Sequence, residues 1–71
     1  MQTVEKNYLG TDENGVPVYN RVIFGKSGET KPTGMHEEIL LRQGDVYVEY
    51  GGNDGTVVYT YDPSTTAWIA M

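Results

Sequence analysis

The sequence GDVYVEYGGNDGTVVYTYDPSTTAWIAM, from Gly44 to Met71, decides the fold class of this chain. Its β-branched and aromatic runs suit a pleated, half-buried surface, and its Gly, Asn, Asp and Pro clusters suit tight turns. The pattern predicts strands at 46–50, 56–61 and 67–71. Because short turns connect these strands, we expect an antiparallel meander.

Alternation of side chains divides the first of these strands into two faces. Val46 and Val48 share one face, and Tyr47 and Glu49 share the other. If the valine face is the inner one, Tyr47 is exposed, which makes it the best candidate for contact with a protein or a sugar. We expect most of the other aromatic residues of this stretch, Trp68 among them, to pair across strands.

The first half of the chain predicts two more strands, at 3–9 and 16–25, joined by a turn that contains Asn14-Gly15. The second of these strands has apolar residues on both faces, so we expect it to be an inner strand. The polar segment 26–34 contains both Gly and Pro and is predicted to be an accessible loop. Binding residues often lie on such loops, although a plain connector is the more common role.

Segment 35–43 is compatible with either a helix or a strand. Its charge order favours a helix, whereas apolar Ile39 and Leu41 on one face favour a strand that pairs with the one starting at Val46. Because so short a helix is marginal, we favour extended structure, or a single helical turn that leads into a strand. The predicted fold is all-β: one small domain over 1–71, an antiparallel meander or sandwich of about five strands.

The size of the chain points towards association with other protein. A domain of 71 residues buries only about 60% of its unfolded surface and often needs disulfides, a metal or a partner. The chain has no Cys and one His, which excludes disulfides, thiolate chemistry and His-rich metal sites, so we expect no metal and no cofactor. No apolar run approaches a membrane span and no leader peptide is recognisable, so we expect no membrane partner.

The net charge of −5 opposes binding to nucleic acid. Ten acidic residues stand against five Lys plus Arg, whereas a surface that follows phosphates needs cations. Apart from the adjacent pairs Asp12-Glu13 and Glu37-Glu38, the acids are spread singly along the chain, which is typical of a solubilising surface. An acidic inhibitor that imitates nucleic acid remains an alternative, and it would require the acids to gather on one face.

Short motifs that could carry chemistry do not continue as that chemistry requires. Gly25-Lys26-Ser27 resembles the end of a phosphate-binding loop, but the earlier Gly and the following helix are missing. The acidic turns at 12–15 and 53–55 lack the alternating oxygen ligands of a calcium loop. His36 and Glu37 are adjacent and cannot face each other as a catalytic pair. We therefore expect no catalytic residues and no enzymatic activity.

From Phe24 onward the order of features resembles small β-modules of tailed bacteriophages and prophages. The likeness covers about residues 24–69 and consists of a KPT loop, a strand, a Gly-rich turn, an aromatic strand ending in Asp, and a Trp strand. The residues that carry it are Lys31, Pro32, Thr33, Gly44, Tyr47, Glu49, Gly55, Tyr59, Tyr61, Asp62 and Trp68. Segment 35–43 departs from the pattern, because it is longer and more apolar.

The resemblance implies a virion-associated structural part: a head-decoration, fibre or tail accessory module without enzymatic activity. The expected partners are a second copy of the chain and a capsid or tail protein, and the expected location is the virion or the bacterial host cytoplasm. The candidate protein-binding residues are Tyr47, Glu49, Lys31 and Thr33. A small carbohydrate-binding module that holds a host-surface glycan on exposed aromatic residues is a further alternative.

Overall fold

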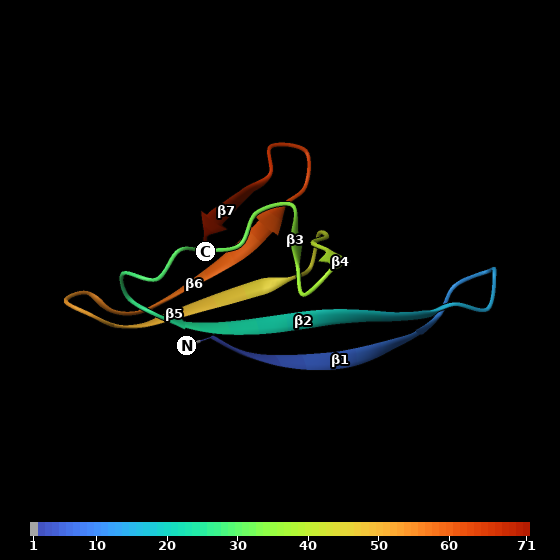
Figure 1. The fold of residues 1–71 in the computed structure, drawn as a ribbon, viewed down its shortest axis with the longest axis horizontal. Coiled ribbons are helices and arrows are strands. Elements are labelled where there is room, and N and C mark those ends of the chain that lie inside the picture. Colours follow the sequence, from blue (N-terminus) through green and yellow to red (C-terminus); the bar gives the residue numbers. More distant parts are fainter. Residues whose placement is uncertain (1) are drawn as a thin grey trace.

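The computed structural model describes residues 2–71 and contains a five-stranded sheet and a small two-stranded hairpin (Figure 1). The strands of the sheet lie in the order β1-β2-β5-β6-β7, and β3 pairs only with β4. The bounds are β1 Thr3–Thr11, β2 Pro17–Lys26, β3 Met35–His36, β4 Ile39–Leu40, β5 Val46–Gly52, β6 Gly55–Asp62 and β7 Ala67–Ala70. The predicted all-β class is confirmed, and so is the inner position of β2.

The predicted meander is confirmed for β5, β6 and β7, but the sheet as a whole is mixed. Strand β5 pairs with β2 in parallel, with Val22 opposite Val46 and Phe24 opposite Val48. The expected hairpin from segment 35–43 into Val46 is therefore wrong. That segment forms the short β3–β4 hairpin, as favoured in its extended form, and then leads back over the sheet.

A buried ion pair fixes where β5 enters the sheet. Asp45, just before β5, accepts a hydrogen bond from the backbone N–H of Arg21 at 3.0 Å and lies 3.2 Å from the Nε of the same residue. On its other side, the backbone carbonyl of Asp45 accepts the N–H of Tyr61 at 3.0 Å. Asp45 thus connects β2 to β6 and places β5 between them, which explains the parallel pairing.

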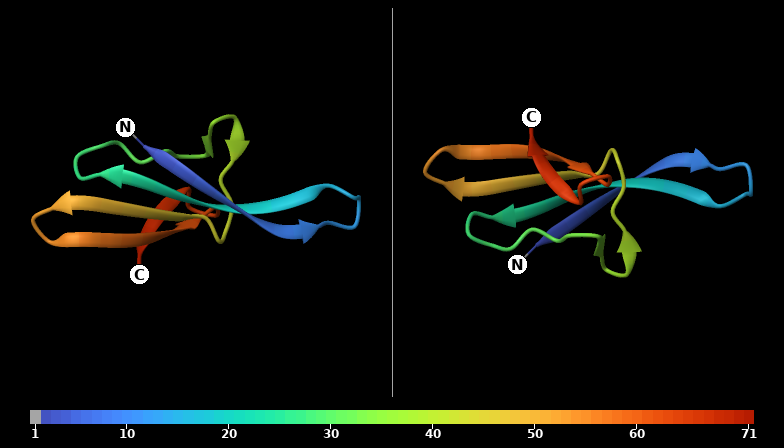
Figure 2. Two further views of the ribbon diagram at one scale, coloured as in Figure 1. Left: turned by 90° about the horizontal axis from the view of Figure 1, so that it is seen from below. Right: turned by 90° about the horizontal axis from the view of Figure 1, so that it is seen from above.

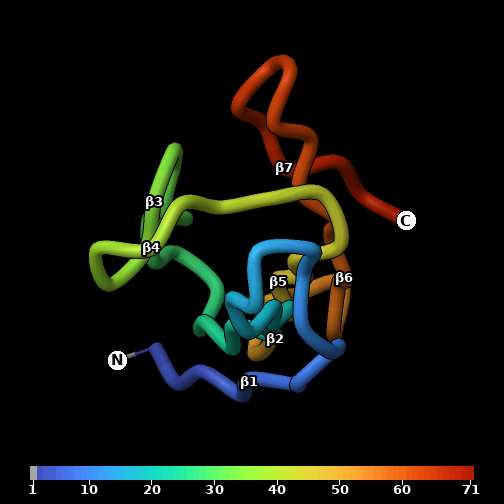
Figure 3. The backbone as a smooth tube through the Cα atoms, turned by 90° about the vertical axis from the view of Figure 1, so that its right-hand side faces the viewer, coloured from blue at the N-terminus to red at the C-terminus, as the bar shows by residue number. Residues whose placement is uncertain are grey.

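The crossover, residues 27–45, covers one face of the curled sheet (Figure 3). The buried apolar side chains lie between the crossover and this face, with three partly buried residues packed against them. The buried residues are Ile23, Leu41, Tyr47 and Tyr61, and the partly buried ones are Val4, Tyr59 and Trp68. The core is therefore small and lies between a single sheet and an irregular segment, not between two sheets as in a sandwich.

The β3–β4 hairpin turns through two left-handed residues, Glu37 and Glu38, with φ angles of 53° and 67°. Non-glycine residues in this region are strained by about 1–2 kcal/mol each, so the surrounding structure must hold them. The Arg21 guanidinium supplies that support by donating to the backbone carbonyls of the hairpin. Its acceptors are His36 O at 3.0 Å, Ile39 O at 3.3 Å and Leu40 O at 2.7 Å.

The β1–β2 hairpin, which we call the arm, extends beyond the other strands (Figure 2). Its turn is closed by Asp12, whose Oδ1 accepts the N–H groups of Asn14 and Val16 at 2.9 Å each. The arm exposes apolar side chains, among them Tyr8 and Tyr19, whose ring centroids lie 5.5 Å apart. Residues 2–71 include no helix with the length and hydropathy to cross a membrane.

Replacing Trp68 with alanine is expected to lower the free energy of unfolding by about 3 kcal/mol, the lower end for a buried Trp. The Trp68 ring lies 4.9 Å from the Tyr61 ring, and its Nε1 donates to Pro32 O at 2.8 Å, so its loss also releases the crossover. Urea unfolding followed by far-ultraviolet circular dichroism measures the change. A loss below about 1 kcal/mol would show that the ring contributes little to the core.

Candidate functional site

The structure brings together three of the four residues predicted to bind protein. The Lys31 ammonium lies 3.0 Å from Glu49 Oε2, 4.5 Å from the centre of the Tyr59 ring and 5.5 Å from that of Tyr47. Thr33, the fourth predicted residue, is exposed on the same segment. Lys31 therefore fastens the crossover to the sheet through an ion pair and two cation–π contacts.

The protonation of Lys31 fits this fastening role. Partial burial lowers the pKa of Lys31, but the hydrogen bond to Glu49 and the attraction of its carboxylate outweigh burial, so the pKa lies above the ordinary value for lysine. The amine is consequently charged at neutral pH. A charged ammonium stabilises an ion pair and is not a nucleophile.

The expectation that Tyr47 is exposed is wrong. Alternation correctly placed it opposite Val46 and Val48, but the crossover covers the tyrosine face, and Tyr47 is 0% exposed. Burial raises the pKa of the Tyr47 phenol above its usual value, and the nearby negative charge of Glu29 acts in the same direction. Tyr47 therefore cannot contact a partner in this structure, and half-buried Lys31 and Pro32 show that the predicted accessible loop packs partly inward.

Among residues 2–71, no second layer covers the opposite face of the sheet, whose apolar side chains are partly buried except for exposed Ile69. We call it the uncovered face and define it by Val22, Phe24, Val46, Val48, Val58 and Ile69. Residues that pair across adjacent strands form two rows on this face. The rows are Phe24-Val48-Val58 and Val22-Val46-Thr60-Ile69. The end of the crossover reaches this side, where Gly44 O accepts the Asn20 side-chain amide at 3.4 Å.

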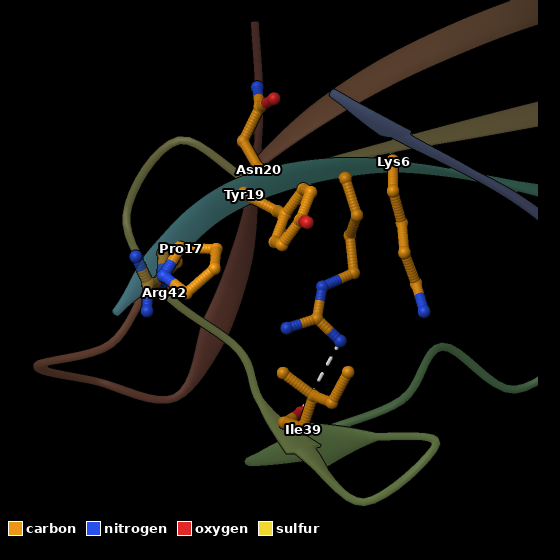
Figure 4. A pocket seen from close by; sticks show the side chains of 7 residues that line it. Lys6, Pro17, Tyr19, Asn20, Ile39 and Arg42 are labelled. Carbon is orange, nitrogen blue, oxygen red and sulfur yellow. Dashed lines mark hydrogen bonds between the residues drawn. The ribbon is translucent and has the colours of Figure 1, made fainter. Parts of the chain in front are cut away.

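A cleft of about 490 Å³ lies where the arm meets the β3–β4 hairpin (Figure 4). Its walls come from β1, β2, β4 and the end of the crossover. The lining residues are Lys6, Pro17, Tyr19, Asn20, Arg21, Ile39 and Arg42. Sequence reasoning missed this cleft, because segments distant in sequence meet there. The one local feature of the sequence that hints at the cleft is that apolar and aromatic residues lie on both sides of the Asn14-Gly15 turn.

Comparison with known protein families, with curated proteins and with solved structures gave no match to this chain. Within the described residues 2–71, no group of three or more His, Cys, Asp or Glu side chains is arranged to hold a metal ion. Two surfaces of the structure offer contacts to a partner, the uncovered face and the cleft.

Proposed function

We propose that this protein is a non-enzymatic structural module that works by binding protein, and that a second copy of the chain covers its uncovered face. The observation that carries the proposal is the apolar character of that face on a single-layer sheet. Sheets with an apolar face are normally buried against another layer. Here the crossover supplies that layer on one side only.

The magnitude of the missing burial supports association. Completing the burial of a half-buried Val or Phe gains on the order of 1 kcal/mol per side chain. Of the six apolar residues of the uncovered face, five are partly buried Val or Phe, and the sixth, Ile69, is 49% exposed and gains at least as much. In a dimer both copies bury this face, so the combined gain is on the order of 12 kcal/mol. The gain exceeds the lower estimates of the entropic penalty of association, about 4 kcal/mol, by about 8 kcal/mol, whereas higher estimates of the penalty leave less. We therefore expect reversible self-association in the micromolar range or weaker.

Charge favours a second copy as the occupant. The chain carries a net charge of −5, so most of its surface repels an identical chain. The two apolar rows of the uncovered face, however, contain no charged residue between β2 and β7. Glu5 of β1 continues the second row beside Val22 at the edge of the face. Two copies that meet through the rows between β2 and β7 therefore need not place like charges opposite each other, which few other surfaces of an acidic chain allow.

Replacing Val48 with lysine is expected to abolish self-association. Val48 is central in its row, and a buried ammonium without a partner disfavours the interface strongly. Sedimentation velocity over a range of concentrations should show the wild-type mass rising above 7.9 kDa, with Val48→Lys remaining at that value. The control is Asn53→Lys in the exposed β5–β6 turn, which adds the same charge and should behave as the wild type.

Two results would count against self-association through this face. One is a wild-type mass of 7.9 kDa at every concentration, and the other is a Val48→Lys variant that associates as the wild type does. A folded circular dichroism spectrum for Val48→Lys ensures that loss of association does not reflect unfolding.

We further propose that the module belongs to a phage or prophage particle, on the basis of the resemblance carried by the Lys31-Pro32-Thr33 loop and the strands that follow. A self-associating small sheet suits repeated placement on a head, fibre or tail. The genes beside its own test this assignment, since particle genes are expected there. A neighbourhood of metabolic or regulatory genes would contradict it.

The carbohydrate-binding alternative would require exposed, coplanar aromatic rings. Tyr47 and Tyr61 are buried, and the exposed rings of Tyr8 and Tyr19 are tilted by 59°. These observations favour protein binding over a flat sugar platform.

A further inference from the structure

The cleft beside the arm concentrates positive charge in an acidic protein. Every charged side chain that lines it is a cation, namely Lys6, Arg21 or Arg42, although the chain has ten acids and only five Lys plus Arg. Within the part of the chain that the structure describes, residues 2–71, no carboxylate lines the cleft. A volume of about 490 Å³ lies within the usual range of ligand sites.

Arg21 is occupied by the fold and supports the cleft. Its guanidinium pairs with Asp45 and donates to three backbone carbonyls of the β3–β4 hairpin, which leaves at most one of its five N–H groups for a ligand. Asp45 also accepts the backbone N–H of Arg42 at 3.0 Å, which fixes the backbone beside the cleft. The buried pair therefore holds the wall in place before any ligand arrives.

The other two cations are free to bind. Within residues 2–71, neither Lys6 nor Arg42 has an ion-pair partner, and in Figure 4 they lie on opposite sides of Tyr19. Tyr19 is 47% exposed and Ile39 is 45% exposed, so an aromatic and an aliphatic surface lie between the two charges. The arrangement is complementary to an apolar group flanked by negative charges.

We propose that this cleft binds an acidic peptide segment in which carboxylate side chains flank an aromatic or aliphatic residue. Arg42 and Lys6 attract the carboxylates, while Tyr19, Pro17 and Ile39 contact the apolar side chain. A peptide fits because its successive side chains can reach both cations and the surface between them. The inference is independent of self-association, since the cleft lies on the face that carries the crossover.

Titration with short blocked peptides, followed by ¹H–¹⁵N NMR, tests the proposal on the full chain. Acetyl-Asp-Phe-Asp-amide is expected to shift the amide signals of Tyr19 and Ile39, with binding that weakens as salt screens the charges. Acetyl-Asn-Phe-Asn-amide has the same shape without charge. It should bind at least about threefold more weakly than the Asp peptide, because it cannot form the partly exposed ion pairs with the two cations. Isophthalate, a small aromatic dianion, serves as a third probe.

Variants connect the binding to the two cations. Lys6→Gln and Arg42→Gln should each weaken binding of the Asp peptide by about three- to fivefold. Lys26→Gln is the matched control, because it removes the same charge from an exposed site outside the cleft and should leave the affinity unchanged. The amide spectra of all three variants report directly whether the fold is retained.

Several outcomes would overturn the proposal. They are equal affinity for the Asp and Asn peptides, absence of shifts with the Asp peptide at low millimolar concentration, or equal weakening by Lys26→Gln. If isophthalate binds and the Asp peptide does not, the cleft takes small dicarboxylates and the assignment to a peptide is wrong.

Discussion

Replacing Gly25 with alanine is expected to lower the free energy of unfolding by at least about 3 kcal/mol, enough to unfold much of a protein this small. A Cβ at Gly25 would overlap the Tyr47 hydroxyl and come within 2.5 Å of Cζ of the same ring. The ring cannot move aside easily, because Tyr47 is fully buried beneath the crossover. Glycine in an inner strand therefore marks the place where this ring crosses the backbone.

Urea unfolding of Gly25→Ala, followed by circular dichroism, measures the change. Gly52→Ala is the matched control, because Gly52 also lies outside the left-handed region and its nearest neighbour, the Ser27 hydroxyl at 3.1 Å, belongs to an exposed side chain. We expect the control to change stability by less than about 1 kcal/mol. Equal stabilities of the two variants would show that Tyr47 does not pack against Gly25.

Replacing Arg21 with methionine is expected to lower the free energy of unfolding by about 3–5 kcal/mol, because it leaves the Asp45 carboxylate buried without its cation. Asp45 is 0% exposed, so water cannot solvate the charge. The substitution also removes the donors that hold the strained turn at Glu37 and Glu38. Both effects destabilise the crossover as well as the entry of β5.

Two further variants separate the contributions in the same unfolding experiment. Arg21→Lys keeps the charge but loses the planar set of donors, so it should be intermediate in stability. Combining Arg21→Met with Asp45→Asn should destabilise the protein by less than the sum of the single changes, because the two side chains act as a pair. Additive effects, or a loss below about 1 kcal/mol for Arg21→Met, would contradict a structural role for the pair.

The strands could be predicted from the sequence because local chemistry determines them. Alternation in 46–50 and the Gly-rich turn after it act over a few residues, and both predictions agree with β5 and its turn into β6. The parallel pairing of β2 with β5 could not be predicted in this way, because it depends on where a crossover of 27–45 returns to the sheet. Nothing in the local pattern of either strand determines its neighbour.

The error about Tyr47 has the same origin. Alternation separates the tyrosine face from the valine face, but only the path of the crossover decides which of the two is covered. One signal was present in the sequence: Arg21 shares a strand face with Ile23, and a charge on an inner strand requires a buried partner. Asp45 is that partner, and it shows which face is inside. The β1–β2 hairpin brings Lys6 and Tyr19 to one wall of the cleft, but the cleft was beyond sequence reasoning, since Ile39 and Arg42 reach this wall only after the crossover folds back.

We propose that the uncovered face packs against the same face of a second copy. Isotope-filtered NOE spectra of a mixture of labelled and unlabelled chains test it most directly, because they detect only contacts between copies. We predict intermolecular NOEs between the methyl groups of Val46, Val48 and Val58 and the Phe24 ring. Intermolecular NOEs confined to the arm or to the crossover, or none at concentrations where the protein associates, would contradict the claim.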